Sequence, residues 1–304
     1  MGVVGMNERN TRIIGALNPR SLYPLVDNKL KTKLLAAEKG VATPALIGAV
    51  KTQHDLKKLS EFLAPHDGFA IKPAKGSGGK GILVIASQRK DTFIKPNGQE
   101  LLIDDVRRHI SNILSGLFSL GGAPDVAVVE ALVRPDSMYE NLSVEGVPDI
   151  RIIVYRGFPI MAMMRLSTRE SDGKANLHQG AVGVGLTISG GRAVNAVQFN
   201  RTIREHPDSG ADLMSIHIPG WAALLELGAR SADATGLGYI GADIVIDRDR
   251  GPLLLELNAR PGLAIQIANG VGLAFRIRDV DAIRSQFFRE SAHQRVMRAM
   301  TMFD

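Results

Sequence analysis

The alternation of apolar and polar positions along this chain predicts a series of β-strands separated by glycine- and proline-containing turns. We expect strands at residues 44–49, 68–73, 82–85, 126–133, 150–156 and 160–165, and a two-stranded hairpin within 180–199. Apolar residues spaced along one face, with caps and glycine stops, predict helices at 27–39, 52–63, 101–117, 221–235 and 281–300. Residues 206–219 form a long irregular loop, of a kind that proteins usually keep for function.

The segment Arg134-Pro135-Asp136 marks the best boundary between two parts of the chain. Before residue 27 the sequence is polar and basic, with only short strand-like dipeptides, and this stretch is too short to form a domain. We therefore expect an N-terminal arm at 1–26, a first lobe at 27–134 and a second lobe at 135–304. A chain of 304 residues is long enough for two lobes with real cores.

Composition excludes several functional classes. The chain has no cysteine, which rules out disulfides, thiolate chemistry and zinc sites with sulfur ligands. No apolar run approaches the roughly 18 residues of a membrane span, and the N-terminus lacks a signal peptide's apolar core, so we expect a cytoplasmic protein without membrane helices. The net charge of +6 permits an anionic partner, but aromatic residues make up only 5% and no basic block is interleaved with them. Phosphate is therefore a better candidate than nucleic acid.

Two carboxylates and an amide near the C-terminal end form the most informative local pattern. Asp243 and Glu256 each interrupt an apolar strand, and the turn at 247–252 between those strands predicts a hairpin. Glu256 and Asn258 lie two residues apart and so share a face, with Asp243 opposite them. Hard oxygen ligands of this kind suit Mg²⁺ bound together with nucleotide phosphates. A protected sheet edge explains the charged turn, but a half-buried Glu256 directly after three leucines is costly without a partner.

A glycine-rich loop at 74–81 joins two predicted strands. Gly76, Gly78 and Gly81 fit the G-x-G-x-x-G pattern, but a dinucleotide fingerprint opens a helix, and here a strand follows. A P-loop needs Ser or Thr after its lysine, and a kinase glycine loop has its lysine downstream, whereas Lys72 precedes this loop. What remains is a flap whose backbone N–H groups cover phosphates, with Lys72 as a point charge, or else a plain glycine hairpin.

In this order, these motifs resemble the ATP-grasp superfamily of carboxylate–amine ligases, and most closely its ribosomal-protein glutamate ligases, with D-alanine–D-alanine ligases more distant. The resemblance covers about residues 28–263. It implies an α+β, ATP-grasp fold with two α+β lobes and ATP between them. It also implies roles in nucleotide binding for two lysines, for the flap and for a hinge strand. These residues are Lys29, Lys72, Gly76, Ser77, Gly78, Gly79, Glu130, Ala131, Leu132 and Val133, with Glu130 near the exocyclic amine of adenine.

The same resemblance implies a catalytic set in the second lobe. Asp149-Ile150-Arg151 and the later Arg165 are similar to the family's Asp-x-Arg strand and following arginine, and Arg165 takes the role of neutralising the transferred phosphoryl group. Asn176 and His178 lie in a segment like the glutamate ligases' Asn-Leu-His, although simple loop hydrogen bonding explains His178 equally well.

The closing motif of the family supplies the remaining implied roles. Arg260, between Asn258 and Pro261-Gly262, is a candidate carboxylate clamp. Asp243, Glu256 and Asn258 match the family's metal triad, which implies Mg²⁺, with Mn²⁺ as an alternative, beside ATP as the cofactor.

The family implies an ADP-forming ligase that makes an amide through an acylphosphate, with glutamate or a similar amino acid as the expected amine. Two alternatives stay open: an ATP-grasp phosphotransferase, and a module that binds MgATP without turnover. Members usually carry a domain of about a hundred residues before the opening helix, whereas only some two dozen residues precede Lys29 here. Since that domain helps to bind substrate, a partner protein or a second subunit is expected to complete the site.

Overall fold

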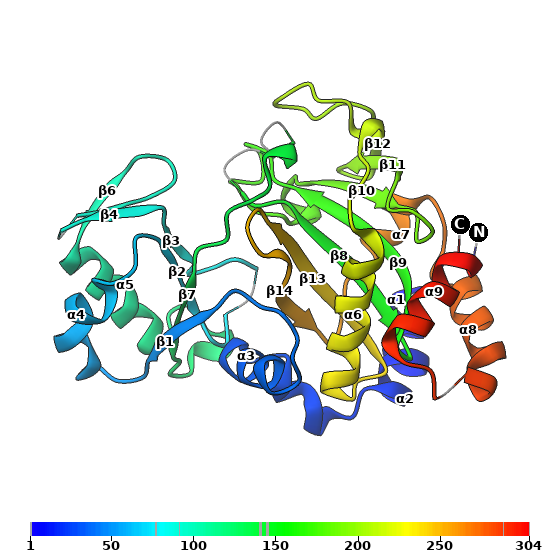
Figure 1. The fold of residues 1–304 in the computed structure, drawn as a ribbon, viewed down its shortest axis with the longest axis horizontal. Helices are drawn as coiled ribbons and strands as arrows, with labels where there is room; N and C mark the ends of the chain where they lie inside the picture. The colour runs from blue at the N-terminus through cyan, green and yellow to red at the C-terminus, as the bar shows by residue number, and fades with distance from the viewer. Residues whose placement is uncertain are drawn as a thin grey trace. The chain divides into compact units, whose positions relative to one another are not determined.

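The computed structural model describes residues 2–76, 78–90, 92–139, 142–143, 146–287 and 289–303. It separates into two compact units (Figure 1). The larger unit holds 1–27, 35–43 and 135–304, and the smaller unit holds 28–34 and 44–134. Helix α3 (Lys29–Glu38) therefore contributes its first turns to the smaller unit and its last turns to the larger one.

The smaller unit is built on an antiparallel sheet with the strand order β1-β7-β2-β3. A second sheet has the order β4-β5-β6. The strands are β1 (Leu46–Val50), β2 (Phe69–Pro73), β3 (Leu83–Ile85), β4 (Ser87–Arg89), β5 (Thr92–Ile94), β6 (Glu100–Leu102) and β7 (Ala127–Ala131). The helices are η3 (Asp55–Lys58), α4 (Leu59–Leu63), α5 (Ile103–Leu114) and η4 (Leu120–Gly122). Apolar side chains of β2, β3 and α5 fill the core, among them Phe69, Ile85 and Ile110.

The larger unit is built on an antiparallel sheet with the strand order β12-β11-β10-β9-β8-β13-β14. Its strands are β8 (Asp149–Tyr155), β9 (Phe158–Leu166), β10 (Val182–Leu186), β11 (Ala193–Gln198), β12 (Arg201–Ile203), β13 (Tyr239–Asp247) and β14 (Gly251–Asn258). The long helices are α6 (Trp221–Thr235), α8 (Leu273–Phe287) and α9 (Ala292–Met302). The shorter ones are α1 (Met6–Glu8), η1 (Arg9–Ile14), α2 (Gly15–Leu17), η2 (Arg20–Leu25), η5 (Ser137–Tyr139), η6 (Leu177–Gln179), η7 (Leu213–Ser215) and α7 (Ala264–Asn269).

The two faces of this sheet carry different helices. Helix α6 lies along one face (Figure 1), where a Cβ added at Gly228 would lie 3.4 Å from the Ile152 side chain of β8. On the other face α7 packs so closely over Gly185 of β10 that an added Cβ there would lie 2.4 Å from the carbonyl oxygen of Ala268. Since neighbouring residues of a strand point to opposite faces, Asp149 and Arg151 point away from α6.

Most predicted strands are present within a few residues, and α6 has the predicted bounds 221–235. The prediction of one helix over 281–300 is wrong, because the chain forms α8 and α9 there, and Ser291 and Gln294 form a capping box that starts α9. Residues before 27 form short helices in place of strand-like dipeptides. The predicted helix at 52–63 begins only at Asp55, and the one at 101–117 begins at Ile103, after β6.

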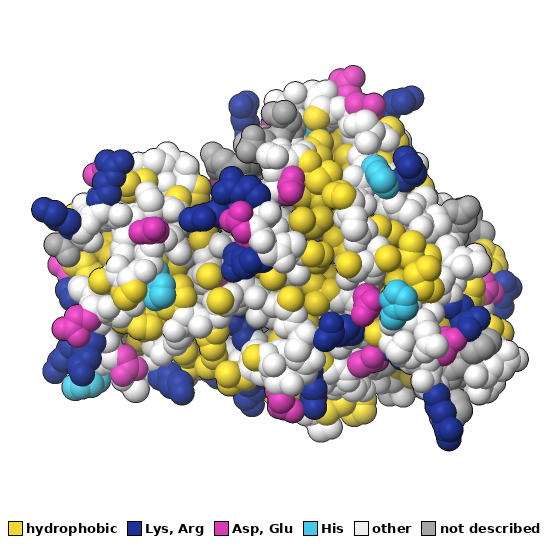
Figure 2. All heavy atoms as spheres, in the orientation of Figure 1, with side chains coloured by type: hydrophobic (Ala, Val, Ile, Leu, Met, Phe, Trp, Pro, Cys, Tyr) yellow, Lys and Arg dark blue, Asp and Glu magenta, His cyan; other side chains and the backbone are white. Residues whose placement is uncertain are grey.

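Two further features are the hydrophobic character of the helices and the distribution of surface charge. No helix in the described part of the chain has the length and apolar character needed to cross a bilayer. On the face shown in Figure 2, Lys and Arg side chains are scattered among Asp and Glu.

Candidate functional site

One face of the larger sheet carries six polar residues from four strands. Asp243 of β13 lies directly opposite Glu256 of β14, and Asn258 follows two residues later on the same face. On its other side Asp243 lies opposite Arg151 of β8. Asp149, two residues before Arg151, lies opposite Arg165 of β9. Because residues opposite one another share a face of the sheet, four adjacent strands place these six side chains on one face.

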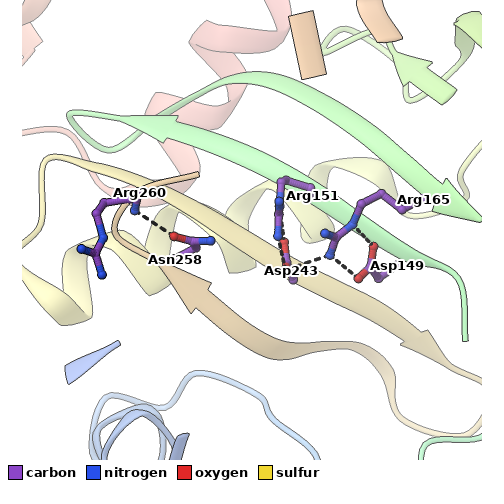
Figure 3. A network of polar contacts seen from close by, with 6 residues as sticks. All are labelled: Asp149, Arg151, Arg165, Asp243, Asn258 and Arg260. Atoms are coloured by element: carbon purple, nitrogen blue, oxygen red, sulfur yellow. Dashed lines mark hydrogen bonds and ion pairs between the residues drawn. The ribbon is translucent and has the colours of Figure 1, made fainter. Parts of the chain in front are cut away.

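Asp149, Arg151, Arg165 and Asp243 form one ion-pair network (Figure 3). Arg151 donates from Nε to Oδ1 of Asp243 at 2.7 Å and from Nη2 to Oδ2 at 2.6 Å. Arg165 donates from Nε to Oδ1 of Asp149 at 2.6 Å, and its Nη2 contacts Oδ2 of Asp149 and also lies 2.8 Å from Oδ2 of Asp243. Two carboxylates and two guanidinium groups thus neutralise each other in a nearly solvent-free setting.

The network separates the pKa values of its two carboxyl groups. Burial alone raises the pKa of Asp243, but Arg151 and Arg165 outweigh it and lower that pKa to about 2. Burial raises the pKa of Asp149, and the neighbouring Asp243 charge adds to this effect against Arg165. Burial works against the charge of Arg165, yet its contacts with the two aspartates raise its pKa. Asp243 is therefore ionised at neutral pH, and Arg165 keeps its charge.

The oxygens of this face can still accept a cation. A carboxylate offers about four lone-pair positions, and Asp243 uses three of them for the two arginines, which leaves one on Oδ1. The side-chain carbonyl of Asn258 accepts one hydrogen bond, from the backbone N–H of Arg260 at 2.8 Å, and keeps a second lone pair. Glu256 is half-buried beside them. These donors fit a hard cation such as Mg²⁺, in keeping with the preference of that ion for carboxylate and carbonyl oxygens. Within the described residues no cluster of three or more His, Asp and Glu side chains could hold a metal ion.

The Arg260 side chain and the 176–178 segment have partners of their own on the larger unit. The Arg260 guanidinium stacks 5.3 Å above the ring centroid of Tyr23 and lies 3.6 Å from Oδ2 of Asp27. Oδ1 of Asn176 accepts a hydrogen bond from the backbone N–H of His178 at 3.1 Å, which starts the short helix η6. The His178 side chain is exposed and lines a cavity of about 680 Å³.

The smaller unit holds the glycine loop between β2 and β3. Lys29 donates from its backbone N–H to the carbonyl of Ala74 and from Nζ to the carbonyl of Gly76, both at 2.8 Å. Gly78 and Gly79 have φ of +62° and +73°, a conformation that favours glycine. Ser77 lies outside the described residues.

Asp125 fixes the start of this loop, and it was not among the predicted site residues. Its carboxylate accepts from the backbone N–H of Lys75 at 2.9 Å and from the hydroxyl of Ser119 at 2.9 Å. At the far end of the loop, Nε2 of His109 lies 3.0 Å from the carbonyl oxygen of Gly81. Both ends are therefore anchored, while an added Cβ at Gly78 would meet no atom within 4 Å.

Glu130 of β7 is buried between two lysines. Its carboxylate lies 2.8 Å from Nζ of Lys33 and also contacts Nζ of Lys72. Burial alone raises the pKa of Glu130, but the two ammonium groups outweigh it and hold the pKa below its ordinary value. Lys33 was not among the predicted site residues, although it lies one helical turn after Lys29. Ala131, Leu132 and Val133 continue the chain from this strand, and the Ala131 N–H donates to the carbonyl of Ala45 at 2.8 Å.

Arg151 was given no predicted role, although the Asp-x-Arg pattern that contains this residue was identified in the sequence. In the structure Arg151 is the closest partner of Asp243. The signal was local, but the contact joins two residues 92 positions apart.

Comparisons with known proteins show which family the chain resembles. The model of the sugar-transfer associated ATP-grasp family matches residues 8–282. A probable alpha-L-glutamate ligase of Maridesulfovibrio salexigens is 27% identical over 238 residues, which cover 78% of this chain and 56% of that protein. A probable alpha-L-glutamate ligase of Xylella fastidiosa is 26% identical over 261 residues, 86% of this chain and 64% of that protein. The chain thus spans less than two thirds of the length of these two relatives.

Among solved structures, the ATP-grasp ligase PsnB complexed with minimal precursor aligns with 92% of this chain and 70% of its own, at 17% identity and a TM-score of 0.48. The family match spans both units apart from the two ends of the chain and includes the polar face of the larger sheet. The chain therefore belongs to the sugar-transfer associated ATP-grasp family.

Proposed function

We propose that this chain is an ATP-dependent, ADP-forming ligase that joins a carboxylate to an amine. One observation carries the proposal: Asp243, Glu256 and Asn258 share a face of the sheet with Arg151 and Arg165. Oxygen ligands and fixed guanidinium groups on one surface suit the handling of nucleotide phosphates. The family match supports ATP as the nucleotide, and the names of the two relatives support ligation.

The metal-binding role falls to Asp243, Glu256 and Asn258. Mg²⁺ held there, or Mn²⁺ in its place, would offset phosphate charge during phosphoryl transfer. The low pKa of Asp243 keeps its carboxylate charged at neutral pH. Asn258 contributes a neutral oxygen whose position is set by the hydrogen bond from the Arg260 backbone.

Arg165 is the candidate for stabilising charge on the transferred phosphoryl group. Its side chain is held by both Asp149 and Asp243, so little reorganisation is required during the reaction. A guanidinium has five N–H donors, and three of those on Arg165 are engaged by the two aspartates. The remaining donors are available for phosphate oxygens.

On the smaller unit, the glycine loop and two lysines would bind the nucleotide. The backbone N–H groups around Gly78 and Gly79 would bind phosphate oxygens, which positive φ values favour. Lys29 and Lys72 would supply positive charge, with Gly76 and Ser77 in the same loop. Glu130 and the following Ala131, Leu132 and Val133 would contact the adenine.

The proposed chemistry has two steps. A substrate carboxylate attacks the γ-phosphorus of ATP, which releases ADP and gives an acylphosphate. The nitrogen of an amine then attacks the acyl carbon, the bond to phosphate breaks, and an amide, inorganic phosphate and a proton result. Asn176, His178 and Arg260 are the candidates for contacting the substrates. The relatives' names make glutamate the first amino acid to test.

Hydroxylamine distinguishes this reaction from its alternatives, because an acylphosphate is an electrophile that a small nucleophile intercepts. With MgATP, hydroxylamine and a panel of amino acids and short peptides, one acid should give a hydroxamate together with ADP and phosphate. A phosphotransferase would give ADP matched to a stable phosphoester, and a binding module would give neither product. Either of those results would overturn the ligase proposal and leave the fold assignment intact.

A further inference from the structure

A cavity of about 680 Å³ lies on the larger unit beside the candidate site. Its volume falls in the range of about 300–1,000 Å³ typical of small-molecule sites. Its walls come from the N-terminal segment, from His178 and Asn200, and from the chain around α7. Among the lining residues are Val3, Met6, Arg9, Gln266, Ile267 and Val271. Aliphatic side chains and glycines dominate this lining, and Arg9 is the one guanidinium among the described residues that form it.

The N-terminal wall is fixed to α7 by the side chain of Gln266. The backbone N–H of Val4 donates to Oε1 of Gln266 at 2.9 Å, and Nε2 of Gln266 donates back to the Val4 carbonyl at 3.0 Å. The backbone N–H of Leu273 also donates to Oε1 at 2.9 Å. Gln266 and Val4 are both buried. Hydrogen bonds from a buried side chain therefore hold this wall of the cavity in place.

Arg9 lines this cavity, and hydrogen bonds to other residues use only some of its N–H donors. Nη1 donates to the carbonyl of Pro261 at 2.9 Å, while Nε and Nη2 donate to Oδ1 of Asn10. Three of its five N–H donors are thus used, and within the described residues no carboxylate pairs with it. Pro261 lies three residues after Asn258, and Gly262 and Leu263 line the cavity. Arg9 is therefore hydrogen-bonded to the segment that follows the proposed metal ligands in the sequence.

Apolar side chains remain exposed around the same cavity. Val3, Met6, Ile267 and Val271 are 60%, 66%, 45% and 46% exposed. A ligand with an apolar body would remove part of this surface from water, which favours binding. A second carboxylate on that ligand would enter an apolar wall without a matching cation, which is costly.

We propose that the cavity binds the amine substrate, and that this substrate is an apolar α-amino acid of the leucine, methionine or phenylalanine class. Arg9 binds its carboxylate, its side chain occupies the wall formed by Val3, Ile267 and Val271, and its amino group stays free to attack the acylphosphate. This assignment rests on the proposed ligase function and makes glutamate a poor amine substrate. Binding itself requires no ATP.

Isothermal titration of the full chain without ATP tests the assignment. L-Leucine and L-phenylalanine should bind at least about tenfold more tightly than L-glutamate. Ile267→Asp places a charge on the apolar wall and should weaken leucine binding at least about tenfold. Met297→Asp, at a position of α9 with 47% exposure against 45% for Ile267, is the matched control and should bind leucine normally.

Arg9→Gln tests the carboxylate contact separately. It should weaken leucine binding about tenfold or more, in line with the loss of a hydrogen bond to a charged group. Leucinamide has no carboxylate and should bind the wild-type protein and Arg9→Gln equally. Equal losses of affinity for leucine and leucinamide in Arg9→Gln would overturn the proposed role of Arg9 in binding the carboxylate.

The results also separate this inference from the ligase proposal. Leucine binding that responds to Ile267→Asp, without any hydroxamate or ADP, would support the cavity and overturn the ligase function. Hydroxamate formation with no binding of apolar amino acids, or equal binding to Ile267→Asp and Met297→Asp, would overturn the cavity assignment and leave the ligase function standing.

Discussion

Arg151 donates hydrogen bonds to both carboxylate oxygens of Asp243, from Nε at 2.7 Å and from Nη2 at 2.6 Å. The pair lies side by side on β8 and β13, and Asp243 is 3% exposed. A two-point contact of this kind fixes the direction of the carboxylate as well as its charge. The proposed metal ligand is thus oriented by the protein before any cation binds.

The stabilising contribution of Asp243 should be lost in acid. Burial alone would raise the pKa of Asp243, but the two arginines lower it from 3.8 to about 2. Because the folded-state pKa lies below the unfolded value, this contribution is present above pH 3.8 and disappears as the pH falls toward 2. The difference in free energy of unfolding between the wild-type protein and Asp243→Asn should therefore shrink over this interval in urea titrations.

The pH dependence of stability expected from Asp149 is opposite to that expected from Asp243. Burial raises the pKa of Asp149 above its ordinary value. A carboxyl group whose pKa rises on folding contributes stability at low pH that is lost as the pH rises. The difference in free energy of unfolding between the wild-type protein and Asp149→Asn should therefore grow as the pH falls. The same trend for both variants would contradict the separation of the two pKa values.

Removing Glu130 should destabilise the protein more than removing one of its lysine partners. Glu130→Gln takes the shared carboxylate away from Lys33 and Lys72, and breaking a buried ion pair in this way costs about 3–5 kcal/mol. Lys72→Met should cost less, because Glu130 keeps its 2.8 Å contact with Lys33. Urea unfolding measures both losses.

The exposed pair of Lys39 and Glu38 supplies the control for this comparison. Glu38→Gln should change the free energy of unfolding by less than about 1 kcal/mol, since surface ion pairs contribute little. A greater loss for Lys72→Met than for Glu130→Gln would show that Glu130 is not the centre of this cluster.

Glu256→Gln should cut ADP formation by roughly 10²-fold or more, as expected when an electrostatic stabiliser is lost. The amide keeps the shape of the side chain and removes its charge from the proposed Mg²⁺ site. Asp249→Asn, on the turn of the same hairpin and 59% exposed, is the control and should keep full turnover. A well-folded Glu256→Gln protein with wild-type ADP production would remove Glu256 from the metal site.

Gly78→Val should weaken ATP binding strongly and leave adenosine binding almost unchanged, because the proposed loop contacts are to phosphate. Gly98→Val is the matched control: both glycines have positive φ, +62° and +82°, and an added Cβ at either would meet no atom within 4 Å. Each variant should pay about 1–2 kcal/mol for its backbone conformation. Equal effects on ATP affinity, measured by titration calorimetry, would leave the loop as a plain glycine turn.

Short-range patterns in the sequence determined the local elements. The hairpin of β13 and β14 follows from two apolar strands around a charged turn, and period two puts Glu256 and Asn258 on one face. The strand, glycine loop and strand at 69–85 are likewise local, because glycine ends regular structure wherever it takes a positive φ. The division between α8 and α9 was missed in the prediction of one helix over 281–300, although the capping box of Ser291 and Gln294 is a local pattern.

The tertiary structure alone decided which charges meet. Arg151 and Asp243 are 92 positions apart, and the register between β8 and β13 is set by the packing of the whole sheet, which no local pattern encodes. The same holds for Lys33 and Glu130, which come from a helix and a distant strand. Arg9 reaches Pro261 across 252 positions because the buried Gln266 fixes the N-terminal segment against α7. Sequence periodicity gives each side chain a face, whereas its partner depends on contacts that form only when distant segments pack together.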